Sequence, residues 1–157
     1  MQENYLDKLK DIASSFRRIN GKIKLLSLLN RAKKEYDSNN YETCEATCLE
    51  ILKSNPKNSV ALRGLGCVAQ VRGEYSKAEK FYKEALVESK NKEIEYTLLG
   101  TIFYIQEDLD KALYYYNLAI DCNDDYEKAY EGRNQTMLEN HLKIIDLQDS
   151  LIKRNLF

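Results

Sequence analysis

The chain has 157 residues, of which 43% are hydrophobic and 31% are charged, a balance typical of folded globular proteins. Its net charge is −1, from 24 basic and 25 acidic side chains, which argues against nucleic-acid binding because that function needs a basic excess or stripe. One proline and six glycines are too few turn-forming residues for a β-rich fold, so we expect an all-α protein.

The composition also bears on location and redox state. No run approaches the ~20 apolar residues that a membrane-spanning helix needs. The residues after Met1 lack the basic and then apolar segments of a signal peptide. We therefore expect a cytoplasmic protein that does not insert into membranes. Four cysteines fit neither a disulfide nor a paired zinc site and are predicted to be small buried hydrophobes: Cys44, Cys48, Cys67 and Cys122.

The predicted elements begin with a helix over residues 3–19 that carries a narrow apolar stripe. Asn20-Gly21 is predicted to break or kink this helix. Three helix pairs follow, with first helices at about 25–38, 59–72 and 93–106 and second helices at about 41–54, 75–89 and 109–122. One long helix, from about 126 to 155, closes the chain. The predicted division is 1–24, then repeats at about 25–58, 59–92 and 93–126 within 25–124, then a capping helix in 125–157.

A period of 34 residues organises the three pairs. Equivalent positions recur in columns, among them Ala32, Gly66 and Gly100, and also Cys48, Tyr82 and Tyr116. The order Leu-Gly, aromatic, Ala, aromatic, Ala in the second and third pairs resembles the tetratricopeptide repeat. This resemblance implies a right-handed α-solenoid of antiparallel helix pairs, in which Gly66 and Gly100 face Ala78 and Ala112.

The resemblance also implies where a partner binds, because the first helices of such repeats line the concave side. These columns form an apolar groove suited to an amphipathic helix or an extended apolar segment, with Lys33 and Arg63 holding an acidic residue at its edge. The predicted partner-binding residues are Asn30, Lys33, Tyr36, Val60, Arg63, Cys67, Val71, Ile94, Leu98, Thr101, Tyr104 and Ile105.

One subgroup of the family holds the acidic C-terminal tails of heat-shock chaperones in a clamp of lysines, arginine and asparagines. The five clamp positions correspond here to Leu29, Lys33, Gly64, Ile94 and Leu98, and none has the required residue. An unpaired carboxylate is costly to desolvate against aliphatic side chains. We therefore expect no binding of heat-shock tails.

No motif for catalysis is apparent. His141, the one histidine, lies among charged residues on the last predicted helix, and there is no phosphate-binding glycine loop and no nucleophile elbow. We expect no enzymatic activity, no cofactor and no metal site.

Three functions remain open at this point. The first is an interaction module or adaptor that binds another polypeptide in the groove. The second is a bacterial type III secretion-type chaperone for a hydrophobic translocator. This chain resembles such chaperones in its size and in its number of repeats. In the third, the chain's own Leu6, Leu9 and Phe16 fill the groove, and the terminal helices form a homodimer.

Overall fold

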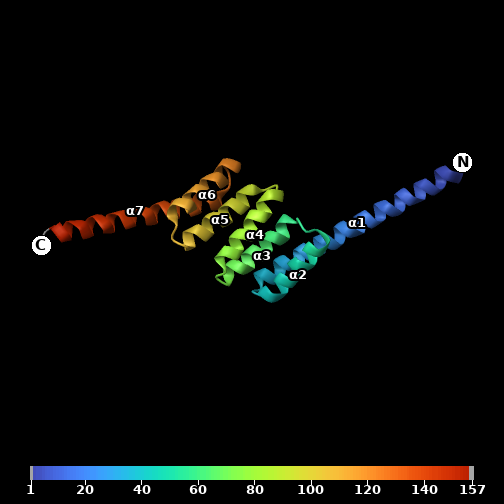
Figure 1. The fold of residues 1–157 in the computed structure, drawn as a ribbon. Coiled ribbons are helices and arrows are strands. Elements are labelled where there is room, and N and C mark those ends of the chain that lie inside the picture. Colours follow the sequence, from blue (N-terminus) through green and yellow to red (C-terminus); the bar gives the residue numbers. More distant parts are fainter. Residues whose placement is uncertain (1, 156–157) are drawn as a thin grey trace.

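The computed structural model describes the backbone of residues 2–155 and the side chains of residues 7, 8, 10–148, 150 and 151. Within this range the chain forms seven α-helices and no strand (Figure 1). The helices are α1 (Gln2–Asp37), α2 (Tyr41–Ser54), α3 (Ser59–Val71), α4 (Tyr75–Glu88), α5 (Lys92–Ile105), α6 (Leu109–Cys122) and α7 (Glu127–Asn155). The predicted all-α class is confirmed, and the paired helices end within one or two residues of their predicted bounds.

The helices pack as successive antiparallel pairs. The second half of α1 packs against α2, α3 against α4, and α5 against α6, while α7 covers α5 and α6 (Figure 1). Three buried clusters follow one another along this stack, centred on Ile51, Tyr82 and Tyr116. No unit buries its apolar face alone, and neighbouring pairs complete a shared core, as in other solenoids.

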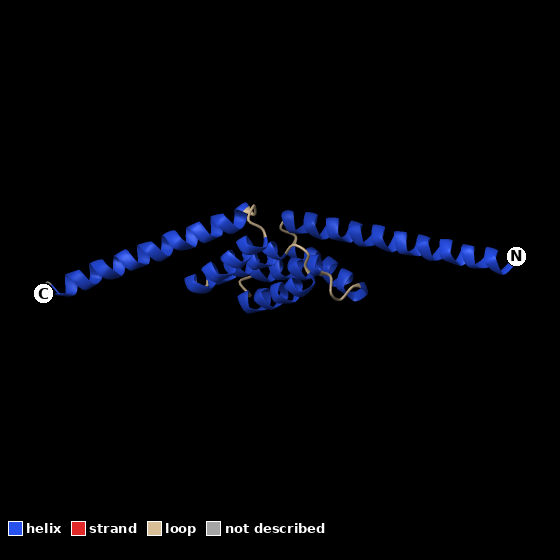
Figure 2. Cartoon of the chain, turned by 90° about the horizontal axis from the view of Figure 1, so that it is seen from above, coloured by secondary structure: helices blue, strands red, loops and turns tan. Residues whose placement is uncertain are grey.

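The predicted break at Asn20-Gly21 is wrong, because α1 runs without interruption through both residues. An exposed glycine inside a helix costs only about 1 kcal/mol relative to alanine, which the good helix formers around it offset. The first part of α1 therefore continues straight out of the stack. Figure 2 shows α1 and α7 extending beyond the helix pairs in opposite directions. The division at residues 24 and 125 stays a prediction.

The turns that close the three pairs have the same geometry. Their left-handed residues are 34 apart: Asn39, Gly73 and Glu107, with φ of 60°, 76° and 61°. The backbone N–H of the following residue donates to a carbonyl five positions back, from Asn40 to Glu35 (2.8 Å), Glu74 to Ala69 (2.9 Å) and Asp108 to Phe103 (2.9 Å). This is the usual helix C-terminal motif, and glycine or asparagine suits the left-handed position best.

Glu107 is the residue least suited to its turn. Glu107→Gly should raise the free energy of unfolding by about 0.5–1 kcal/mol, because a left-handed residue with a Cβ is strained by about 1–2 kcal/mol and glycine's extra entropy offsets part of the gain. The lost ion pair with Lys143 is exposed and contributes little. Urea unfolding measures the change, and Gly73→Ala is the control that should lose stability. A Glu107→Gly protein that unfolds at a lower urea concentration than wild type would contradict this account.

Close packing within each pair depends on a tyrosine ring set against a glycine. Tyr82 and Tyr116 are buried, and a Cβ on Gly100 would lie 2.8 Å from two ring carbons of Tyr116. At Gly66 the nearest atoms are likewise those of the Tyr82 ring. Ala78 and Ala112 are fully buried, but each glycine makes room primarily for a ring and not, as expected, for an alanine.

Replacing such a glycine should overpack the core. Gly100→Ala should lower the free energy of unfolding by about 1–3 kcal/mol, since the Tyr116 ring must shift. Gly21→Ala is the matched control, because no described atom beyond its own helix lies within 4 Å of a Cβ there. Chemical denaturation of both variants, followed by circular dichroism, tests the pair. Equal effects of the two substitutions would refute the packing argument.

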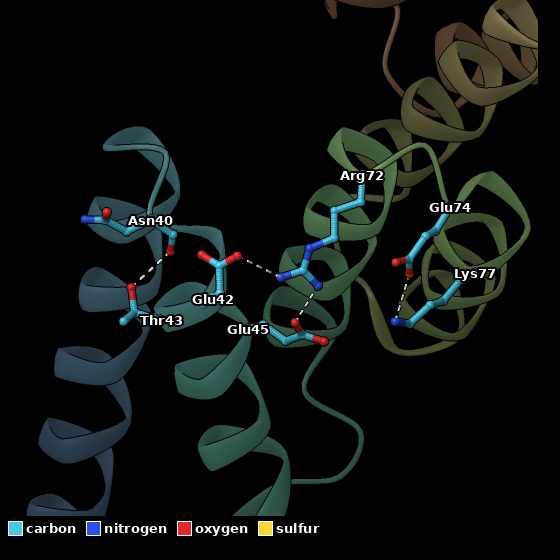
Figure 3. A network of polar contacts seen from close by, with 7 residues as sticks. All are labelled: Asn40, Glu42, Thr43, Glu45, Arg72, Glu74 and Lys77. Atoms are coloured by element: carbon cyan, nitrogen blue, oxygen red, sulfur yellow. Dashed lines mark hydrogen bonds and ion pairs between the residues drawn. The ribbon is translucent and has the colours of Figure 1, made fainter.

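A polar contact between neighbouring pairs lies at the turn end of the stack (Figure 3). The guanidinium of Arg72, at the end of α3, lies 2.6 Å from Glu45 and 3.7 Å from Glu42, both on α2. These carboxylates raise the pKa of Arg72. The contact fixes how α3 and α2 meet, and these helices form two walls of the cavity described next.

Candidate partner-binding pocket

A cavity of about 270 Å³ opens between α1, α2 and α3. Its floor is apolar and includes the buried thiols of Cys44 and Cys48, whereas Lys33 and Arg63 bring positive charge to it. No acidic side chain occurs among the described residues of the lining. The lining residues are Leu29, Ala32, Lys33, Tyr36, Cys44, Cys48, Val60, Ala61, Arg63, Gly64 and Cys67.

The position of α3 determines the shape of the cavity. Asn58 caps the helix, with its side-chain oxygen accepting a hydrogen bond from the backbone N–H of Ala61 at 2.9 Å. One turn further, Gly64 allows α3 to approach α2 closely, since a Cβ there would lie 2.7 Å from the sulfur of Cys48. Gly64 and the Cys48 thiol that it meets both belong to the cavity lining.

The Arg63 side chain is held by a buried carboxylate. Its Nη1 lies 3.5 Å from Oε1 of Glu95, and Glu95 is fully buried on α5. Neither oxygen of Glu95 accepts a hydrogen bond from the described residues. A buried charge needs a partner. The positive charge of Arg63, on α3 of the second repeat, therefore compensates the negative charge of Glu95, on α5 of the third. Sequence reasoning missed this carboxylate, although the residues 34 before and 34 after it are the buried Ala61 and Ala129.

Removing Arg63 alone should therefore destabilise the protein more than removing Arg63 and Glu95 together. Arg63→Met should lower the free energy of unfolding by about 3–5 kcal/mol, because it leaves the Glu95 charge buried without compensation. Adding Glu95→Ala, which places at residue 95 the alanine found 34 residues before and after it, should recover most of this loss. A double-mutant cycle by urea unfolding measures both effects. If the double variant is no more stable than Arg63→Met, the two side chains do not depend on each other.

The cysteines differ sharply in their surroundings. Burial raises the pKa of the Cys48 thiol to about 12, and burial also raises the pKa of Cys44 and of Cys67. The prediction of four buried cysteines is wrong for Cys122, which is exposed on α6, and Cys67 is only half-buried. The three thiols at the cavity are therefore uncharged at neutral pH and present an apolar surface, as expected for buried cysteines.

Thiol reactivity provides a direct check of this arrangement. At pH 8 a disulfide reagent such as 5,5′-dithiobis(2-nitrobenzoate) should react rapidly with one thiol, Cys122, because a thiol with a raised pKa supplies little of the reactive thiolate. Cys67, half-buried in the lining, should react next, and Cys44 and Cys48 only on unfolding. Cys122→Ser should remove the fast phase. A fast phase that survives this substitution would show that the cavity thiols are ionised or open to solvent.

The structure gathers only part of the predicted site around this cavity. Five of the twelve predicted residues line it: Lys33, Tyr36, Val60, Arg63 and Cys67. Asn30 is exposed on α1, and Val71 and Ile105 are exposed at the ends of α3 and α5. Ile94 and Leu98 are half-buried on α5. Thus the cavity lies at the first two repeats, and the apolar surface continues along α3 and α5 outside it.

Two predicted residues make contacts within the protein. The hydroxyl of Thr101 donates to the carbonyl of Thr97 at 2.9 Å and lies 3.2 Å from the Tyr116 hydroxyl. The Tyr104 hydroxyl lies 3.5 Å from the side-chain nitrogen of Gln135 on α7. Both side chains therefore help to join α5 to α6 and α7.

The hypothesis that the chain fills its own groove is wrong for Phe16. Its side chain is exposed on the straight extension of α1, which leads away from the stack and cannot fold back without breaking the helix (Figure 1). The side chains of Leu6 and Leu9 lie outside the described residues.

Other kinds of site receive no support from the described part of the chain. It contains no group of three or more His, Cys, Asp or Glu side chains placed to hold a metal ion. None of its helices is long and apolar enough to cross a membrane.

A stack of antiparallel helix pairs with a 34-residue period defines the class of tetratricopeptide-repeat folds. Solved structures place the chain in this fold, while no protein-family model and no curated protein matches its sequence. The tetratricopeptide-repeat domain of Sgt2 from Aspergillus fumigatus aligns with a TM-score of 0.68 and 16% identity, over 75% of this chain and 80% of that one.

Two further solved structures show the same fold. The type III secretion chaperone SycD of Yersinia enterocolitica, in complex with a peptide of the translocator YopD, aligns with a TM-score of 0.66 and 18% identity, over 74% of this chain and 95% of that one. The O-GlcNAc transferase of Thermobaculum terrenum aligns with a TM-score of 0.67 and 22% identity over 72% of this chain, which covers only 22% of that enzyme's length. At these identities the similarity establishes the fold alone.

Proposed function

We propose that the protein is an interaction module that binds a partner polypeptide by taking one of its apolar side chains into the cavity between α1 and α3. A carboxylate of the partner next to that side chain lies near Lys33 and Arg63. The observation that carries this proposal is an apolar cavity of about 270 Å³ with cationic side chains but no acidic ones in its described lining. No catalysis and no cofactor are part of the proposed role.

The lining favours this kind of ligand. Uncharged thiols and aliphatic groups form the floor, so a buried charge of the ligand would be unpaired there, whereas an aliphatic or aromatic side chain would displace water from apolar surface. Glu95 already balances Arg63 in part. Lys33, which is exposed, is therefore the cation more available to a ligand carboxylate.

Beyond the cavity, the partner chain would follow the inner faces of α3 and α5. Val71 and Ile105 are exposed there, and Ile94 and Leu98 are half-buried. An amphipathic helix or an extended apolar segment fits such a surface. The clamp positions Leu29, Gly64 and Leu98 offer no donors, so an acidic heat-shock tail should not bind.

Selection from a library of random peptides tests the ligand chemistry. Peptides selected on the wild-type protein should combine an aliphatic or aromatic residue with a neighbouring Asp or Glu. Val60→Asp places a charge at the edge of the cavity and should weaken these peptides about tenfold or more in calorimetry, whereas Val87→Asp on α4 should not. Val60 and Val87 are both exposed valines, so the added charge is matched.

Two further variants separate the parts of the proposed site. Lys33→Glu should weaken acidic peptides and remove the salt dependence of their binding. Val71→Asp with Ile105→Asp should abolish capture of longer segments yet keep the helical content. Selected peptides that bind all of these variants as tightly as wild type would place the site elsewhere, on the convex face or the termini.

A second candidate is a type III secretion-type chaperone for a hydrophobic translocator. It is favoured by the fold shared with SycD, which was solved with a translocator peptide, and by the predominantly apolar lining of the cavity. This function predicts a ligand without acidic residues. Translocator-derived apolar peptides that bind wild type and Lys33→Glu equally, but not Val60→Asp, would favour it over the first.

A further inference from the structure

The first half of α1 exposes a line of apolar side chains, here called the α1 seam. Each of its members is between 52% and 63% exposed, and Figures 1 and 2 show this part of α1 standing clear of the helix stack. The seam consists of Ile12, Phe16, Ile19, Ile23 and Leu26. The steps between them alternate strictly between four and three residues, which is the a/d spacing of a heptad repeat.

The seam is narrow and extends in sequence beyond the described side chains. The same alternation continues backward at Leu9 and Tyr5 and forward at Asn30. A strict a/d stripe is the pattern of a helix that pairs with another helix, whereas a membrane-surface helix buries a wider apolar face. Most of the stability of a helix in a protein comes from packing of its apolar face, so a partner helix would also stabilise the first half of α1.

The orientation of the seam allows two stacks to be present at once. Leu28 and Ala32 pack into the first core cluster. With 100° of rotation per residue, they point almost opposite to Leu26 and Asn30 respectively. Two α1 helices in contact along their seams would therefore carry their helix stacks on the outside of the pair.

The residues that flank the seam are compatible with a second copy. In a parallel pair, the facing flank residues would be Lys8 with Ala13, Ser15 with Asn20, and Lys22 with Ser27. None of these pairs joins like charges. The charged residues Asp11, Arg17, Arg18 and Lys24 occupy heptad positions away from the contact.

We propose that two copies of the protein associate through a parallel coiled coil of their α1 seams, with Asn30 facing Asn30 as the polar layer that sets the register. From residue 12 to residue 30 this contact spans about 27 Å at 1.5 Å per residue. The alternative helix, α7, has this spacing in two runs of three apolar residues, Leu138, Leu142 and Ile145, and Ile144, Leu147 and Leu151, and the next positions are the charged Asp149 and Arg154. The dimer would display two copies of the cavity, which strengthens binding to a partner with two ligand segments.

Light scattering coupled to size-exclusion chromatography tests the proposal on the full chain. Wild type should be a dimer at micromolar concentration. Phe16→Glu, which places two facing carboxylates in the seam, should be a monomer. Ser14→Glu adds the same charge on the opposite side of α1 and should remain a dimer. Phe16 lies outside the three core clusters, so unfolding of the helix stack should be unchanged in Phe16→Glu, which separates loss of association from loss of folding.

The remaining outcomes each contradict the proposal. A monomeric wild type would show that the seam does not pair with itself, and a Phe16→Glu dimer would move the contact to α7 or to the stack. Binding of monomers to phosphatidylcholine–phosphatidylserine vesicles, lost in Phe16→Glu, would make the seam a membrane contact. Orientation is tested by Ile23→Cys in a Cys122→Ser background, which should form an intermolecular disulfide on oxidation; its absence in a confirmed dimer would rule out the parallel arrangement.

Discussion

The contact between a glycine on one helix and a tyrosine ring on the next is the constraint on which the rest of the structure depends. Gly66 receives Tyr82, and Gly100 receives Tyr116, so the two helices of a pair approach more closely than any side chain at those glycines would allow. The same ring of Tyr116 also occupies the space at Gly132 on α7. One tyrosine thus joins its own pair to the helix that covers it, and the stack grows by repeating this contact.

The cavity follows from a variation of the same contact. In the first pair the place of the tyrosine is taken by Cys48, a much smaller side chain, while Gly64 on α3 keeps the helices close. A small residue facing a glycine leaves volume unfilled, and the cavity lies at that junction. The stack is therefore most open where its repeat departs furthest from the aromatic pattern. Arg63 adds a charge to that opening because Glu95, buried in the next repeat, requires one.

The two ends of the chain obey a different constraint from the middle. The first helix of each pair ends at one of the left-handed turns, α1 among them at Asn39, whereas between its two halves α1 has only Gly21, and a helical glycine does not end a helix that is otherwise well formed. Consequently α1 has one part packed against the stack and one part that stands clear of it. Its second half supplies a wall of the cavity, and its first half presents the α1 seam, so association of two copies and binding of a ligand would use successive parts of one helix.

The sequence by itself determined the period and, from residue 41 to residue 122, the bounds of the paired helices, because local turn chemistry and apolar spacing encode these properties directly. First-helix columns project to one side of any such stack, and five residues predicted from them line the cavity: Lys33, Tyr36, Val60, Arg63 and Cys67. Glycine spacing also indicates that α7 packs like the first helix of a further repeat, because Gly132 follows Gly64 by two periods of 34 residues. Only the tertiary structure decided that the hydroxyls of Thr101 and Tyr104 lie close to the side chains of Tyr116 and Gln135. It also decided that Cys44 and Cys48 form the cavity floor and that Glu95 is buried against Arg63. All of these contacts depend on the distance between neighbouring helix pairs. Side chains from three helices together set that distance, so it cannot be read from one position of the repeat.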